Sequence, residues 1–213
     1  MRRWSACLVI LAVATSSASE LKINSGQRLL ERNGQQSAVP IGEQIDALAF
    51  RDTAGQTHRV SSKPATTLVF LSTSCPLAKR YTMRLNRMHD VFAESGISVI
   101  GVFSNSEDVR DDVVQHAGNM NFAFPTVKDE HGYLAKRLGA TMTPQAIVLD
   151  RQGKVRYRGA IDDNRYENRV KQSYLHDALT AIRDGHSIET AETKSLGCSI
   201  HLPEAKDSGA ITY

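Results

Sequence analysis

Two cysteines of the sequence could carry redox chemistry, and Cys75 stands where a strand is expected to give way to a helix. It follows the apolar run 68–71 and immediately precedes Pro76. Proline suits the first position of a helix because the N–H that it lacks would have no intrahelical partner there. The free N–H groups of a helix start favour a thiolate over a thiol. Since α/β proteins place their sites at the carboxyl ends of strands, we predict a reactive, solvent-reachable Cys75 rather than a buried structural one.

Cys198 lies in a polar C-terminal tail that shows no clear periodicity. It lies thirteen positions after Gly185, where the last expected helix ends, and this length can span roughly 40 Å, enough to reach Cys75. A permanent bridge would stabilise the fold by on the order of 5 kcal/mol in the chain-entropy model. In a transient bridge, Cys75 would attack a substrate and Cys198 would resolve the mixed disulfide. A mobile tail favours the transient bridge; a free Cys198 or a bridge to another chain remains open.

A second chemical signal is the pair Thr143-Pro144, which opens the apolar stretch 146–148. Proline cannot donate a hydrogen bond within a sheet, so it belongs at the first residue of a strand. A cis bond here would expose the neighbouring backbone for pairing with an extended thiol substrate. Periodicity alone favours an ordinary trans proline at this position.

The elements that must position these residues follow from the apolar pattern. The expected order is a hairpin over 45–61, a buried strand over 68–71, a helix over 77–92, a buried strand over 97–103, a short helix near 109–114, a helix over 133–138 capped by Gly139, paired strands over 145–149 and 154–158, and a last helix that begins at Ser173 and ends before Gly185. Strand–helix–strand units predict parallel pairing, and the late hairpin adds an antiparallel edge. We therefore expect an α/β fold with a mixed central sheet and helices on both faces.

Composition and the amino terminus narrow the class of protein. The net charge is +3, with 26 basic and 23 acidic residues scattered along 213 positions, so a nucleic-acid surface is not expected. Arg2 and Arg3 precede the apolar run 4–14 and the small residues that end at Ala18. This pattern is typical of a secretory signal and is too short for a permanent membrane span, although an uncleaved anchor is the alternative. We predict export to a periplasm or the exterior, where disulfides persist; Cys7 would be lost with the signal.

The expected domain organisation is a signal peptide at 1–18, a polar lead-in at 19–40, one domain at 41–185 with the hairpin as its N-terminal extension, and an irregular tail at 186–213. The order strand, Cys75-Pro76, helix, strand and then Met142-Thr143-Pro144 resembles the thioredoxin-like superfamily. In particular, it resembles the secreted redoxin, or alkyl hydroperoxide reductase/thiol-specific antioxidant-like, branch. Three segments carry the closer resemblance: 74–81 (SCPLAKRY), 157–163 (YRGAIDD) and 197–200 (GCSI). The resemblance implies a thioredoxin-like fold over about residues 40–185, a nucleophilic Cys75 and a cis Pro144 that faces it.

The sequence departs from two patterns of that superfamily. Ala78 replaces the second cysteine of a Cys-x-x-Cys motif, so there is no local resolving thiol. Ser72 and Cys75 match the peroxiredoxin pattern Pro-x-x-x-Thr/Ser-x-x-Cys, but Leu68 occupies its proline position. The candidates to replace the distal arginine of peroxiredoxins are Arg151, Arg156 and Arg158.

The leading hypothesis is an exported thiol-disulfide oxidoreductase or antioxidant redoxin without a cofactor. Cys75 would be the nucleophile and Cys198 the resolving cysteine, while Thr143 and Pro144 would shape the substrate groove. Expected partners are protein or small-molecule thiols and disulfides, hydroperoxides as the alternative substrate, and an unidentified reductant. The alternatives are a thiol peroxidase, a non-catalytic binding module whose bridge staples the tail, and a copper carrier that uses both cysteines with His201. We expect no metal site, and we expect Asp162-Asp163 to form a turn rather than an acid pair.

Overall fold

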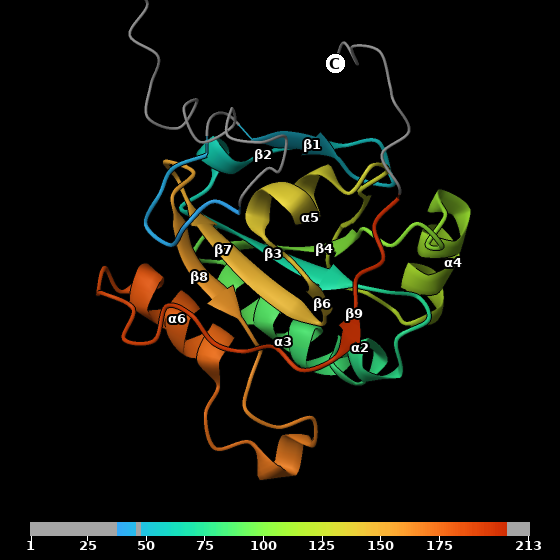
Figure 1. Ribbon diagram of the computed structural model, residues 1–213. Coiled ribbons are helices and arrows are strands. Elements are labelled where there is room, and N and C mark those ends of the chain that lie inside the picture. Colours follow the sequence, from blue (N-terminus) through green and yellow to red (C-terminus); the bar gives the residue numbers. More distant parts are fainter. Residues whose placement is uncertain (1–37, 46–47, 204–213) are drawn as a thin grey trace, which may run out of the picture.

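A mixed β-sheet forms the centre of the protein. The structure is a computed structural model that describes residues 38–45 and 48–203; the predicted signal peptide, Cys7 and most of the lead-in lie outside the described residues. Within them, five strands pair in the order β5-β4-β3-β7-β8 (Figure 1). Their bounds are β3 Ala65–Leu71, β4 Ser98–Phe103, β5 Thr126–Lys128, β7 Gln145–Asp150 and β8 Val155–Gly159.

The pairing is parallel on one side of β3 and antiparallel on the other. Leu68 of β3 lies opposite Ile100 of the parallel strand β4 and opposite Ile147 of the antiparallel strand β7. All seven residues of β3 are buried, as expected for a central strand covered on both faces. The mixed sheet predicted from the sequence is therefore confirmed.

Helices cover both faces of this sheet. Val69 and Leu71 of β3 face one apolar cluster, to which α3 (Thr82–Ala93) and α6 (Tyr174–Arg183) contribute. Leu68 and Phe70 face a second cluster, which is covered by α5 (Tyr133–Leu138) and by the hairpin of β1 (Ala49–Arg51) and β2 (Thr57–Arg59). The remaining helices are α2 (Pro76–Arg80), α4 (Arg110–Asn119) and two 3₁₀ turns, Val60–Ser62 and Glu167–Arg169. No helix within the described ranges has the length and apolar character needed to cross a bilayer.

The helix expected over 77–92 is divided in two. Helix α2 ends at Arg80, and Tyr81 joins it to α3 with its N–H bonded to Ala78 O, which tightens the turn. The Tyr81 side chain is buried, and its hydroxyl reaches Asp162 in the loop after β8. The helical spacing of apolar residues continues from α2 into α3 because both helices face the same apolar cluster.

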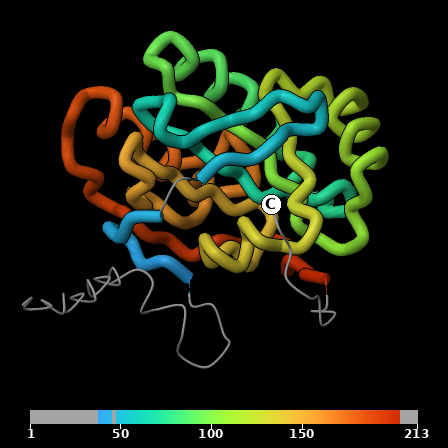
Figure 2. Tube along the Cα trace, turned by 90° about the horizontal axis from the view of Figure 1, so that it is seen from above, coloured from blue at the N-terminus to red at the C-terminus, as the bar shows by residue number. Residues whose placement is uncertain are grey.

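The tail is bound to the domain over the part that the structure describes, contrary to the expected mobile segment. Strand β9 (Cys198–Ser199) pairs antiparallel with β6 (Met142–Thr143). Earlier in the tail, Ala191 O accepts a hydrogen bond from Arg158 N–H, and Thr193 N–H donates to Arg158 O. Figures 1 and 2 show the tail, in orange to red, running along the outside of the domain from α6 to β9. Main-chain pairing and a few scattered apolar contacts, at Ile188, Ile200 and Leu202, hold this segment, so hydrophobic periodicity gave no sign of it.

Candidate redox site

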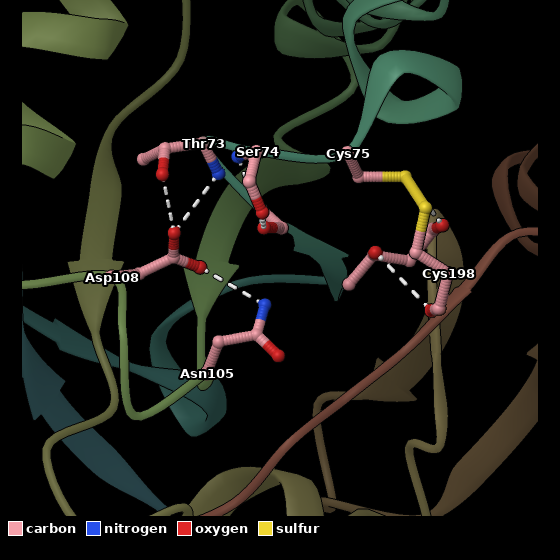
Figure 3. Close-up of a disulfide and its surroundings, with 8 residues drawn as sticks. Thr73, Ser74, Cys75, Asn105, Asp108 and Cys198 are labelled. Atoms are coloured by element: carbon pink, nitrogen blue, oxygen red, sulfur yellow. Dashed lines mark hydrogen bonds between the residues drawn. A yellow bond between two sulfur atoms is a disulfide. The ribbon is translucent and has the colours of Figure 1, made fainter.

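Cys75 lies at the junction of β3 and α2, where the sequence places it. It is the N-cap residue of α2, and Pro76 occupies the first helical position. Its sulfur is bonded to that of Cys198, and the two Cα atoms are 6.1 Å apart (Figure 3). The structure therefore joins two cysteines that are 123 positions apart in the sequence.

The proline-led strand lies directly beside this disulfide. The Thr143-Pro144 peptide bond is cis, so the trans proline that periodicity favours is wrong and the cis form implied by the family resemblance is found. Thr143 lies opposite Cys198 in the β6–β9 pair, and its hydroxyl donates to Cys198 O at 3.3 Å. The Cys75 sulfur lies 3.3 Å from Thr143 O. Cys75, Cys198, Thr143 and Pro144 thus converge at one edge of the sheet.

The predicted solvent exposure of Cys75 is wrong for this oxidised state. Cys75 is only 2 % exposed and packs with Ala78 in the apolar cluster under α2 and α3. Cys198 is half-buried, and it covers the Cys75 sulfur through the bond between them. Because the covering group belongs to the tail, reduction of the disulfide removes the covalent link that keeps it there.

A chain of polar side chains connects the segments that carry the two cysteines. Asp108 is 1 % exposed, and its Oδ1 accepts from the N–H and the hydroxyl of Thr73 at 3.0 and 2.5 Å. Asn105 donates from Nδ2 to Asp108 Oδ2 at 3.0 Å (Figure 3), and its Oδ1 accepts from His201 N–H at 2.8 Å. We call Thr73, Asn105, Asp108 and the His201 backbone the polar bridge. It fixes the loop before Cys75 relative to the tail after Cys198.

The short helix α2 favours the Cys75 thiolate less than the continuous helix expected from the sequence would. It has five residues and ends at Arg80, so its dipole is that of little more than one turn. The carbonyl oxygen of Thr143 beside the sulfur favours a thiol, which could donate to it, over a thiolate.

Of the three arginines expected to replace a distal arginine, Arg156 and Arg158 are engaged by other partners and Arg151 is exposed. Arg156 pairs with Asp150, and Arg151 is exposed in the turn after β7. Arg158 donates to the carbonyl oxygens of Leu138 and Val39. Their partners place these side chains against the lead-in, α5 and the β7–β8 turn.

Sequence reasoning missed a buried ion pair close to the site. Asp162, expected in a simple turn, accepts from the Tyr81 hydroxyl at 2.9 Å and pairs with Arg84. Both charged side chains are at least nine-tenths buried. Burial, followed by the hydrogen bond to the Asp162 carboxylate, raises the pKa of Tyr81 above its usual value. The Arg84–Asp162 ion pair links α3 to the loop after β8. Tyr81 and Asp162 belong to the segments 74–81 and 157–163, two of the three segments that carry the family resemblance.

A cavity of about 470 Å³ lies between this ion pair and the disulfide. Leu77, two residues after Cys75, and Leu196, two residues before Cys198, line it together with Pro144. Two further lining residues, Ala160 and Ile161, are apolar. The others carry polar groups: Tyr81, Asp162, Asp163, Asn164, Arg165, Tyr174 and Lys194. Its volume is that of a small-molecule site.

The residues considered for copper do not form a ligand set here. The two cysteine sulfurs are bonded to each other, and the His201 backbone is bound to the Asn105 side chain. Across residues 38–45 and 48–203, no group of three His, Cys, Asp or Glu side chains is arranged to hold a metal ion.

Comparison with known proteins places the chain in a family. Residues 41–158, more than half of the chain, match the AhpC/TSA family. The Thiol:disulfide interchange protein DsbE of Yersinia pestis is 34% identical over 94 residues, which are 44% of this chain and 47% of that protein. The chain thus matches about half the length of this curated relative.

Solved structures agree on the fold. An uncharacterized conserved protein from Geobacillus kaustophilus is 29% identical, with a TM-score of 0.70 over 78% of this chain and 94% of the other. A hypothetical protein from Sinorhizobium meliloti is 25% identical, with a TM-score of 0.70 over 79% and 98%. A peroxidoxin from Mycobacterium tuberculosis, 21% identical with a TM-score of 0.51 over 70% and 99%, shares the fold. The chain belongs to the AhpC/TSA family and is a thioredoxin-like redoxin.

Proposed function

We propose that the protein is an exported thiol-disulfide oxidoreductase in which Cys75 is the nucleophile and Cys198 the resolving cysteine. The observation that carries the proposal is the disulfide between a strand–helix junction cysteine and a tail cysteine, next to the cis Pro144. Thr143 and Pro144 shape the groove in which the substrate sulfur meets Cys75.

The reaction is two successive thiol–disulfide exchanges. The Cys75 thiolate attacks one sulfur of a substrate disulfide, so that a mixed disulfide forms and one substrate thiolate leaves. The Cys198 thiolate then attacks the Cys75 sulfur, which closes the Cys75–Cys198 bond and releases the second substrate thiolate. The substrate disulfide gains two electrons, and the protein dithiol loses them.

Regeneration requires an external thiol reductant, and the two sulfurs are unequal targets for it. Cys75 is 2 % exposed, whereas Cys198 is half-buried. An incoming thiolate therefore attacks Cys198, and Cys75 departs as the thiolate. The polar bridge and the β6–β9 pairing hold Cys198 near Cys75 between cycles, which raises the effective concentration of the resolving thiol.

Peroxide reduction is the second candidate, and the match to the AhpC/TSA family favours it. There, Cys75 thiolate would attack a hydroperoxide, giving a Cys75 sulfenic acid and an alcohol, and Cys198 would condense with the sulfenic acid and release water. The engagement of Arg156 and Arg158 by other partners, together with Leu68 in place of a proline, favours disulfide substrates instead.

The proposal includes export and a domain plan. The signal pattern at 1–18 and a disulfide in the folded protein both suit an oxidising compartment. A lead-in at 19–40 would precede the redoxin domain at 41–185, and the tail at 186–213 would deliver Cys198.

Mass spectrometry of the thiol states tests the proposal. The reduced protein is treated with oxidised glutathione or with hydrogen peroxide and then alkylated. With oxidised glutathione we expect the Cys75–Cys198 bridge in the unmodified chain, and a Cys75–glutathione adduct that persists in Cys198→Ser. Cys75→Ser is the matched control and should form an adduct far more slowly. Equal adduct rates on both single-cysteine variants would contradict the proposed roles, and a sulfenic acid at Cys75 under peroxide, faster than the adduct, would favour the peroxidase.

A further inference from the structure

The cavity beside the disulfide is positively charged in a way that thiol exchange alone does not explain. Arg165 and Lys194 line it, and both side chains are exposed. Asp162, the buried carboxylate in its wall, is already neutralised by Arg84 and bonded to Tyr81. Asp163 is the remaining acidic group of the lining, so the unpaired basic charge exceeds the acidic charge by one.

A cluster of arginines extends the positive charge beyond the cavity. The ring of Tyr166 is approached by three guanidinium groups: Arg80 at 5.7 Å, Arg165 at 5.3 Å and Arg169 at 5.3 Å from its centroid. These distances are in the range of cation–π attraction. Within residues 38–45 and 48–203, no carboxylate forms an ion pair with any of the three. Like charges gathered on one ring repel each other, and a bound anion would relieve this repulsion.

The cavity also brings this charge close to the segments that carry the two cysteines. Its lining includes Leu77, two residues after Cys75, Leu196, two residues before Cys198, and Pro144, which follows Thr143 in the strand beside the disulfide. A molecule whose sulfur lies against Pro144 can therefore direct its other end to Arg165 and Lys194. The volume of about 470 Å³ suits a molecule of tripeptide size or smaller.

We propose that this cavity binds the carboxylate of an anionic small-molecule thiol or disulfide, with Arg165 and Lys194 as the residues that select its charge. The inference rests on the proposed thiol-disulfide exchange and names the class of its substrate. In the reducing direction, the anionic thiolate attacks the Cys198 sulfur, a mixed disulfide forms and the Cys75 thiolate leaves. A second thiolate then attacks the substrate sulfur of the mixed disulfide, which yields the substrate disulfide and the Cys198 thiolate; two substrate thiolates are oxidised, and the protein disulfide is reduced.

Three thiols of similar size test the proposal on the oxidised full chain: 3-mercaptopropionate, which is anionic, 2-mercaptoethanol, which is neutral, and cysteamine, which is cationic. Each rate of reduction of the Cys75–Cys198 bridge is divided by the rate of the same thiol with 2-hydroxyethyl disulfide. This ratio removes differences in thiol pKa and nucleophilicity. We expect the anionic thiol to be favoured over the cationic one by about tenfold at low salt.

Two further measurements locate the selecting charges. The double variant Arg165→Gln, Lys194→Gln should bring the preference close to one. Arg59→Gln, Lys63→Gln is the matched control, because these exposed side chains flank the opposite end of β3; it should keep the preference. On the unmodified protein, about 0.5 M salt should reduce the preference severalfold.

The outcomes separate this inference from the proposed function. The anionic site would be overturned if the three thiols reduced the bridge at equal normalised rates, or if the Arg165→Gln, Lys194→Gln variant kept the preference for the anionic thiol. Either result would leave thiol exchange intact. Failure of all three thiols to open the bridge in the folded protein would count against thiol exchange itself, and the anionic substrate would fall with it.

Discussion

The central strand and the tail are attached to the molecule by different forces. Strand β3 buries all seven of its residues, and Leu68, Val69 and Phe70 are 0 % exposed. In the tail, Leu196 is 71 % exposed, and a few apolar contacts, at Ile188, Ile200 and Leu202, act together with main-chain hydrogen bonds, the polar bridge and one disulfide. The apolar burial of the sheet does not depend on the redox state, whereas one of the tail's attachments, the disulfide, exists only in the oxidised protein.

This difference assigns separate tasks to the two regions. The sheet keeps Cys75 and Pro144 in place whether or not the disulfide exists. In the proposed reaction the tail delivers Cys198, and we expect it to open locally at a smaller free-energy cost than global unfolding. A variant in the sheet should therefore destabilise the oxidised and the reduced protein equally, whereas a variant in the tail should destabilise mainly the oxidised protein.

The largest effect is expected in the sheet. Phe70→Ala removes a fully buried ring from the cluster under α5 and should lower the free energy of unfolding by about 3–5 kcal/mol. Chemical denaturation of the oxidised and reduced proteins checks this, and the loss should be similar in both. A loss confined to the oxidised protein would show that the sheet and the tail are not independent.

Gly197→Ala should act on the tail alone. A Cβ at this position would overlap Thr143 O, so β9 must move away from β6. We expect the oxidised form to lose about 1–3 kcal/mol, because main-chain hydrogen bonds of the tail are strained or broken. The Cys75–Cys198 pair should then be reduced more readily, with a midpoint potential higher by tens of millivolts.

Gly118→Ala is the matched control for that variant, since a Cβ at Gly118 in α4 meets no atom within 4 Å. Its midpoint potential should equal that of the unmodified protein. An unchanged potential in Gly197→Ala would contradict the close approach of β9 to β6.

Asn105→Ala should have a smaller effect through the polar bridge. It removes the acceptor for His201 N–H and the donor to Asp108, and leaves a buried carboxylate oxygen with one partner fewer. We expect a cost of about 1–2 kcal/mol and slower closure of the Cys75–Cys198 bridge after Cys75 has formed a mixed disulfide. Stopped-flow trapping of the mixed disulfide measures that rate, with Asn119→Ala, an exposed change in α4, as the control.

The smallest effect concerns pH and the β1–β2 hairpin. Burial alone would raise the pKa of Asp52, but hydrogen bonds from His58 and from the Gln56 backbone outweigh it, and the pKa is lowered from its usual value of 3.8. The carboxylate therefore stabilises the folded state above pH 3.8, and this contribution, about 1 kcal/mol, is lost as the pH falls through the folded pKa. Asp52→Asn should flatten that part of the stability–pH curve; an identical slope in both proteins would exclude the role of this carboxylate.

The sheet and its helices were predictable because their residues carry periodic signals. The apolar run 68–71 predicted β3, the stripe of Leu175, Ala178, Leu179 and Ile182 predicted α6, and Gly139 marked the end of α5. Cys75 was predictable at the strand–helix junction for the same reason. The cis form of Pro144 followed from the family resemblance and not from periodicity.

The contacts that complete the site had no local signal. Arg84 and Asp162 are 78 positions apart, and their pairing depends on how α3 meets the loop after β8. The tail pairs largely through its backbone, which any sequence can provide, and the glycines that mark its close approaches, Gly132, Gly159 and Gly197, carry no periodic signal. The burial of Cys75 in the oxidised state follows from that pairing, so exposure could not be predicted from its position alone.

A redox titration of the Cys75–Cys198 pair tests the proposed reaction most directly. The folded protein is equilibrated with glutathione buffers of graded potential and alkylated, and the fraction of bridged cysteine is read by mass spectrometry. We expect a single reversible two-electron transition with a midpoint above about −300 mV, the limit below which structural disulfides resist the glutathione pool. A bridge that stays closed in every buffer and opens only when the sheet unfolds would contradict a catalytic role for these two cysteines.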